Sequence, residues 1–321
     1  MSAPATPVVR APDVTTLGTT ARGSGRPKKA RTGSLVEGWL RGHTLLIYLF
    51  LYVPIIIVVV FSFNGTDRRV TQWGGFSFRW YESVLNDTVV QSALLNSMIV
   101  ASSTAVIATI FGSMAALGLQ RAPKWFRTPF EALTFISIIV PEIVIALATL
   151  VFFSTAFDVL NPAFDLQFRL GFQTIIAAHA LFNISLVMLL VRARLSGMDR
   201  THVEASYDLY GTPWRTFWQI TFPQLLPAIV AGFLLSFTFS FEDYVITTFV
   251  SGAGSTTLPL YVFSTIRKGV TPATNAVAAI MLLITLAILV VGQFLVWRNA
   301  RRSGQRGAQA SVAGMIVEQS G

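Results

Sequence analysis

Six long apolar runs alternate with shorter polar stretches along this 321-residue chain. A helix that crosses a membrane needs about 20 predominantly apolar residues, because the hydrocarbon core is about 30 Å thick. Backbone groups in hydrocarbon must be hydrogen-bonded within their own segment, so each run should be helical. The pattern therefore predicts an all-α integral membrane protein with six transmembrane helices. They are expected at residues 45–63, 94–119, 130–153, 172–191, 228–250 and 276–297.

Composition and charge agree with this class of protein. Charged residues make up only 12% of the chain, whereas soluble domains carry about a quarter. Of the 24 Lys and Arg residues, 18 fall on one side of the predicted spans and six on the other. An excess of positive charge marks the cytoplasmic side of a membrane. We therefore expect a multi-pass protein of the cytoplasmic membrane with both termini in the cytoplasm.

The same reasoning divides the chain into three regions. Residues 1–44 are predicted to form a disordered, basic cytoplasmic tail, because they are rich in Pro, Gly, Thr and basic residues. Residues 45–297 are expected to form the six-helix transmembrane domain within membrane lipid, and residues 298–321 a second cytoplasmic tail. The net charge of +9 follows from this topology, and no folded basic domain is predicted that would bind nucleic acid.

The motifs of catalysis and of cofactor binding are missing from the sequence. It contains no Gly-x-x-x-x-Gly-Lys-Ser/Thr phosphate loop, so we do not expect this chain to bind ATP by that route. His43, His179 and His202 lie on separate segments without metal-ligand spacing, and there is no cysteine. We expect no bound cofactor, no metal and no enzymatic activity.

Three acidic residues fall inside the predicted spans, where a charge is costly and usually faces a cavity or a partner. Glu142 follows Pro141 in the third span, and Glu242 and Asp243 lie in the fifth. We expect Pro141 to open or kink the helix and to place Glu142 in a first turn, where the helix dipole favours negative charge. No basic residue is evident at comparable depth, so internal ion pairing does not readily explain the acids.

The fifth span also carries a predicted polar stripe. Its members recur at steps of four, three and four residues, which places them on one side of a helix: Ser236, Ser240, Asp243 and Thr247. Glu242 lies at the edge of this stripe, and Phe241 and Tyr244 are neighbouring aromatic candidates for contact with a cation. The stripe suits a cation path. A seam between helices held by hydroxyl hydrogen bonds is the alternative, and the sequence leaves both open.

A polar, helix-forming loop at about residues 193–227 separates the fourth and fifth predicted spans. It carries charged residues early and an aromatic face later, and such a loop is suited to docking against a soluble partner. Its opening residues, Glu204-Ala205-Ser206 and Asp208-Leu209, resemble the cytoplasmic loop of ABC importer permeases of the type I (MetI-like) fold. The stretch Ile220-Thr221-Phe222-Pro223 is similar to the end of that signature.

The resemblance extends over residues 45–297 and is strongest to the C-type permease subunits of spermidine/putrescine importers. The similar stretches lie at residues 48–57, 62–64, 80–81, 141–144, 236–245, 258–260, 268–270 and 275–276. In one position the chain departs from the signature. Tyr210 stands where the family has a glycine, and Gly211 follows it, so we expect the bend of the loop to shift by one residue.

The resemblance implies a transport mechanism. Two homologous permeases would pair around a path, and two copies of a cytoplasmic ATPase would bind ATP and Mg²⁺. An extracytoplasmic binding protein would deliver a polyamine such as spermidine or putrescine. The coupling helix would involve Glu204, Ala205, Ser206, Asp208, Leu209, Gly211, Trp214, Ile220 and Pro223.

Two alternatives remain at this point. The same fold imports other small solutes, including opines, phosphonates and ferric iron. A stand-alone channel or proton-coupled carrier would use the intramembrane acids as a relay, although such a protein has no reason to keep the loop that begins at Glu204.

Overall fold

The structure is a computed structural model that describes residues 32–66, 72–165 and 167–318. Regular structure within these ranges is helical, apart from one isolated antiparallel bridge between Asn64 and Phe76. The chain divides into two compact units, residues 1–54 and 55–321. The first helix, α1 (Thr32–Ser62), begins in one unit and ends in the other.

The second unit contains the remaining helices. In chain order these are α2 (Arg79–Asn86), α3 (Thr88–Arg121), α4 (Lys124–Ile139), α5 (Glu142–Phe164), α6 (Phe172–Ser196), α7 (Thr201–Asp208), α8 (Pro213–Thr216), the π-helical turn η1 (Phe217–Thr221), α9 (Phe222–Glu242), α10 (Val245–Val250), α11 (Leu258–Ile266) and α12 (Pro272–Glu318).

Six segments of the described chain have the length and apolar character to cross a membrane, which confirms the predicted number. They are Val36–Ser62, Thr88–Arg121, Glu142–Phe164, Phe172–Ser196, Pro213–Glu242 and Pro272–Phe294.

Two of the predicted spans are interrupted. The predicted span 130–153 contains a break between α4 and α5 at Val140 and Pro141, which confirms the expectation that Pro141 opens or kinks the helix. Proline has no backbone N–H and disfavours helical geometry in the residue before it. The predicted span 228–250 straddles a second break, between α9 and α10.

The predicted N-terminal tail also needs correction. Residues 1–31 lie outside the described residues, but residues 32–44 form the first turns of α1 instead of disordered chain. No proline occurs between Pro27 and Pro54, so nothing in this segment removes a helical hydrogen bond. In the first unit, the described side chains of α1 are exposed from Val36 onward.

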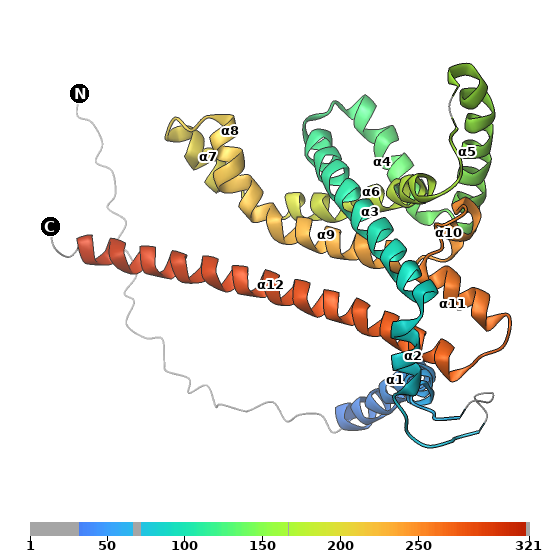
Figure 1. Ribbon diagram of the computed structural model, residues 1–321. Coiled ribbons are helices and arrows are strands. Elements are labelled where there is room, and N and C mark those ends of the chain that lie inside the picture. The colour runs from blue at the N-terminus through green and yellow to red at the C-terminus, as the bar shows by residue number, and fades with distance from the viewer. Residues whose placement is uncertain (1–31, 67–71, 166, 319–321) are drawn as a thin grey trace, which may run out of the picture. The chain divides into compact units, whose positions relative to one another are not determined.

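Helix α3 packs against α6 and α9 in the second unit, and Figure 1 shows the three lying together. Small residues on α3 make this approach possible: Ala101, Ala105 and Ala108 are fully buried. A Cβ atom added at Gly112 would lie 2.8 Å from the Val187 Cβ atom of α6. Small residues on α3 therefore allow a close contact between the backbones of neighbouring helices.

Three clusters of buried apolar residues follow from this packing. One joins α2, α3, α9, α11 and α12, and another joins α3, α6 and α9. The third is formed by α3, α5, α6 and α10, and its members are Val100, Ala146, Ile175, Ala178, Ile246 and Val250. This third cluster lies where the polar residues described below come together.

Gly112→Ala should destabilise the protein by about 1–3 kcal/mol, because the added methyl group overpacks the contact with Val187 and the α6 backbone. Gly118→Ala is the matched control on α3, since its Cβ atom would meet nothing within 4 Å. That control should be neutral or slightly stabilising. Thermal unfolding of the detergent-solubilised variants measures both, and equal losses would contradict a close α3–α6 contact.

Candidate transport site and coupling loop

The break between α9 and α10 is centred on Asp243, which has an extended backbone with φ −66° and ψ 127°. Its carboxylate accepts hydrogen bonds from backbone N–H groups in the first turn of α10, which have no partner within that helix. Oδ2 accepts both the backbone N–H and the hydroxyl of Thr247, each at 2.8 Å, and Oδ1 accepts the N–H of Ile246 at 3.3 Å. Asp243 therefore caps the first turn of α10 in the way that Asp caps helices in general.

A histidine on α6 completes the polar cluster. His179 is 2% exposed, and its Nε2 atom lies 2.9 Å from Asp243 Oδ2. Its Nδ1 atom lies 2.8 Å from the Ser240 hydroxyl. A carboxylate only accepts hydrogen bonds, so the imidazole donates from Nε2 to Asp243 Oδ2. In the tautomer with its hydrogen on Nε2 alone, Nδ1 accepts from the Ser240 hydroxyl.

A second carboxyl group faces this cluster from α5. Glu142 is the first residue of α5, directly after Pro141, which confirms the prediction that it lies in a first turn. Its side-chain carboxyl faces that of Asp243, and α5 packs against α10. Glu142 is exposed, as is Glu242 at the last position of α9, whereas Asp243 is buried.

In the structure, the predicted polar stripe lies in a buried contact between helices. Ser240 and Thr247 both contact His179, with Thr247 Oγ1 at 3.2 Å from Nε2. Ser236, one turn earlier on α9, is fully buried. Ser240 and Thr247 thus form the hydrogen-bonded seam that the sequence left open as an alternative to a path, whereas the Ser236 hydroxyl has no hydrogen-bond partner among the described residues.

The two aromatic candidates for contact with a cation, Phe241 and Tyr244, stack on other aromatic rings of the protein. Phe241 is 1% exposed and stacks on Phe237 within the packed core. Tyr244 stacks on Phe263 with ring centroids 3.9 Å apart. The Phe241 ring is therefore not presented at a surface, while Tyr244 is half-buried.

His179 is the residue that sequence reasoning missed. The expectation of no basic partner at the depth of the acids is wrong, because this imidazole contacts Asp243 directly. A signal was available: His179 interrupts an apolar run and is followed four residues later by Asn183, whose side chain donates to the His179 carbonyl oxygen. The partner on another helix was not deducible from spacing.

The predicted loop forms a compact helical hairpin. α7 is followed by a reversal and then by α8, which continues through η1 into α9, and Figure 1 shows α7 and α8 at the end of α9 remote from α10. The hydroxyls of Ser206 and Thr216 lie 2.8 Å apart and tie α7 to α8. At the start of α7, hydrogen bonds from the side chain and backbone of Thr201 lower the pKa of Asp199.

The reversal after α7 is a Schellman motif, a helix ending in which a left-handed residue closes two backbone hydrogen bonds. Tyr210 has φ 57°, and its N–H donates to Tyr207 O, while the Gly211 N–H donates to Ser206 O. The bend therefore stays at Tyr210, and the expected shift to Gly211 is wrong. Gly211 is needed for space, because an added Cβ atom would lie 2.6 Å from the Ser206 carbonyl oxygen.

The hairpin presents several large side chains to the surroundings. Leu209 is 82% exposed and Trp214 is 73% exposed. Glu204, Ala205, Asp208 and Pro223 are also exposed, whereas Ser206, Gly211 and Ile220 are half-buried. The structure thus brings most of the predicted loop residues onto one hairpin with an uncovered apolar surface.

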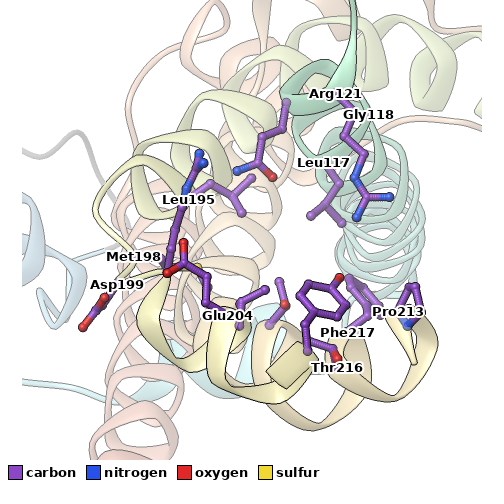
Figure 2. Close-up of a pocket in the computed structure, with 15 residues that line it drawn as sticks. Leu117, Gly118, Arg121, Leu195, Met198, Asp199, Glu204, Pro213, Thr216 and Phe217 are labelled. Carbon is purple, nitrogen blue, oxygen red and sulfur yellow. The ribbon is translucent and has the colours of Figure 1, made fainter. Parts of the chain in front are cut away.

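A pocket of about 620 Å³ lies between the hairpin and the ends of α3 and α6. Figure 2 shows the side chains that surround the opening, including Leu117 and Arg121 of α3, Leu195 of α6, and Glu204 and Phe217 of the hairpin. α7 itself packs against α8 and η1. The hairpin therefore projects from the helices of the second unit and is joined to them through η1 and α9.

Six helices with the length and apolar character to cross a membrane, an interruption within the fifth span and an exposed helical hairpin are typical of a membrane permease. Comparison with known proteins gives the family. The family described as "Binding-protein-dependent transport system inner membrane component" matches residues 108–304. The chain belongs to this family, and it is the transmembrane permease subunit of an ABC importer.

Individual relatives match over most of the chain. The spermidine/putrescine transport system permease protein PotC of Haemophilus influenzae is 38% identical over 255 residues, which cover 79% of this chain and 95% of PotC. The putrescine transport system permease protein PotI of Escherichia coli is 38% identical over 265 residues, covering 82% and 91%. A solved bacterial ABC transporter that imports the acidic polysaccharide alginate has the same fold, with a TM-score of 0.68 at 13% identity, covering 83% of this chain and 98% of that one.

Tyr210→Gly should strengthen the end of α7 by up to about 1 kcal/mol, because a left-handed conformation strains any residue with a Cβ atom. Tyr210 is 97% exposed, so its removal sacrifices little packing. Gly211→Ala should weaken the same turn. Hydrogen exchange of the hydrogen-bonded amides of residues 210 and 211 measures both effects.

Gly197→Ala is the control, since an added Cβ atom there meets atoms only at 3.8 Å or beyond. Faster exchange of these amides in Tyr210→Gly than in the unmodified protein would contradict the prediction that Tyr210 is strained.

Proposed function

We propose that this protein is a polyamine permease subunit of an ATP-driven importer, with spermidine or putrescine as its cargo. The relatives that match most of the chain are named for these two amines. The structural observation that carries the proposal is the exposed Glu142 carboxyl beside the break between α9 and α10. A carboxylate at the end of a span can balance one charge of a flexible polycation during transit.

Glu142 and Glu242 are the cargo-facing groups in this proposal, and Asp243 supports them from the interior. Asp243 is surrounded by donors from His179, Ile246 and Thr247, so it has little remaining capacity to bind a cargo amine. Contacts with the cargo should be few and weak, because a path that binds tightly does not release.

The partners follow from the same assignment. Two copies of an ATPase subunit bind ATP and Mg²⁺, a second homologous permease completes the path, and an extracytoplasmic binding protein delivers the polyamine. The hairpin of α7 and α8 seats on an ATPase subunit, and its exposed Leu209 and Trp214 supply apolar contact. A hairpin closed by the Ser206–Thr216 hydrogen bond is stiff enough to transmit a rigid-body movement.

Orientation supports this arrangement. The bias of 18 Lys and Arg residues to one side supports a cytoplasmic location for both termini and the hairpin. ATP-driven closure of the ATPase subunits then turns the path outward to receive cargo, and hydrolysis returns it inward. No cofactor is assigned to this chain, and ATP hydrolysis belongs to the partner subunits.

Glu142→Gln should lower spermidine uptake by about tenfold, which corresponds to about 1.4 kcal/mol of lost transit stabilisation. The assay is uptake of labelled spermidine by the full transporter reconstituted with its ATPase and binding protein. Asp158→Asn is the matched control, because Asp158 is an exposed carboxylate on the same helix, about 24 Å away along α5. It should transport normally.

Two outcomes would contradict the proposal. Unchanged uptake in Glu142→Gln would remove this carboxylate from the path. Import of spermidine without ATP or the ATPase would identify a stand-alone carrier, and import of an anionic solute in its place would change the cargo.

A further inference from the structure

We propose that His179 is a positioning residue for transport. Its imidazole contacts residues on both sides of the break between α9 and α10. Through the Asp243 carboxylate, it sets the position of the cargo-facing Glu142 carboxyl. The inference rests on the proposed function, in which Glu142 contacts the polyamine. It assigns a specific task to a buried polar group that the transport cycle described above does not otherwise use.

The ring contacts residues on both sides of the break. Ser240 belongs to α9, and Thr247 belongs to the first turn of α10. Nδ1 holds Ser240 at 2.8 Å, and Nε2 lies 2.9 Å from Asp243 Oδ2 and 3.2 Å from Thr247 Oγ1. Because the imidazole is rigid, the two helix ends cannot separate or rotate against each other without breaking one of these contacts.

The same carboxylate connects the ring to Glu142. Donors from α6 and α10 hold Asp243 on its buried side, and the Glu142 carboxyl faces it from α5. Because these donors hold the Asp243 carboxylate in place, the Glu142 carboxyl that faces it has a fixed neighbour. A movement of Asp243 therefore changes the position that the Glu142 side chain adopts.

Helix packing reinforces this connection. α10 packs against both α5 and α6, and Ala146 of α5 shares an apolar cluster with Ile175 of α6 and Ile246 of α10. A shift of α10 is thus transmitted to the first turn of α5. Loss of the imidazole should displace Glu142 even though the two residues make no direct contact in the described structure.

A buried histidine that only locks helices together makes a different prediction. Its loss would lower stability, and the effect on transport would be independent of Glu142. Effects of independent sites add as free energies, whereas residues that act through one network do not. A double-mutant cycle therefore separates a positioning role from a merely structural one.

The cycle compares His179→Phe, Glu142→Gln and the double variant in the reconstituted full transporter, with labelled spermidine uptake as the readout. Each single substitution should lower the rate by about tenfold, and the double variant should fall little further. A combined loss of about a hundredfold would overturn the inference, because it means that the two side chains act separately.

Two further variants serve as controls. His179→Gln keeps a donor and an acceptor on one side chain, and it should recover at least half of the lost rate. Met188→Ala removes a buried side chain on the same helix, outside the polar cluster. Its effect should multiply with that of Glu142→Gln. If His179→Phe does not assemble, His179→Asn replaces it in the cycle, since its shorter amide cannot span both partners.

Hydrogen exchange gives a test that does not depend on the cargo. His179→Phe should loosen residues 142–146 and 245–250 while α3 stays protected. Loosening throughout α6, as in Met188→Ala, or an unchanged 142–146 segment would overturn the inference. If wild-type protein imports a different solute, the proposed cargo fails, yet this exchange pattern still decides the role of His179.

Discussion

The Asp243 carboxylate stabilises a helix break in a part of the chain that is expected to lie in hydrocarbon. A break there leaves backbone N–H groups without partners, and each costs several kcal/mol when no water is present. Asp243 accepts two of these groups, from Ile246 and Thr247, and His179 holds the carboxylate in place. The end of the fifth span is thereby fixed to α6, and the Glu142 carboxyl beside it acquires a defined neighbour.

The rest of the bundle supports this interaction at a distance. Close packing of α3 on α6 through Gly112 fixes the helix that carries His179, and Val187 of α6 also meets Gly232 of α9. α9 runs from the hairpin at one end to Glu242 at the other. In the proposed mechanism, a push on α7 and α8 would act on the same helix whose far end leads into the Asp243 break.

Sequence patterns predicted the number of spans and the position of the loop, because apolar run length and polar composition are local properties. The interruptions were harder to predict. The break at Pro141 is predictable from the proline itself. The break at Asp243 depends on a side-chain carboxylate that accepts hydrogen bonds from backbone N–H groups of α10. The pairing of His179 with Asp243 is a tertiary contact, so spacing along the chain carries no trace of it. Tyr210 shows that a favourable motif can impose a strained conformation on an unsuited residue.

The hydrogen bond between His179 and Asp243 holds the helix break on which the proposed transport site depends. Solid-state NMR of the protein in lipid, with labelled histidine and aspartate, tests it directly. We expect an imidazole that carries a proton at Nε2, with a dipolar contact between that nitrogen and the Asp243 carboxyl carbon. A His179 ring protonated only at Nδ1, or the absence of any contact with Asp243, would contradict it.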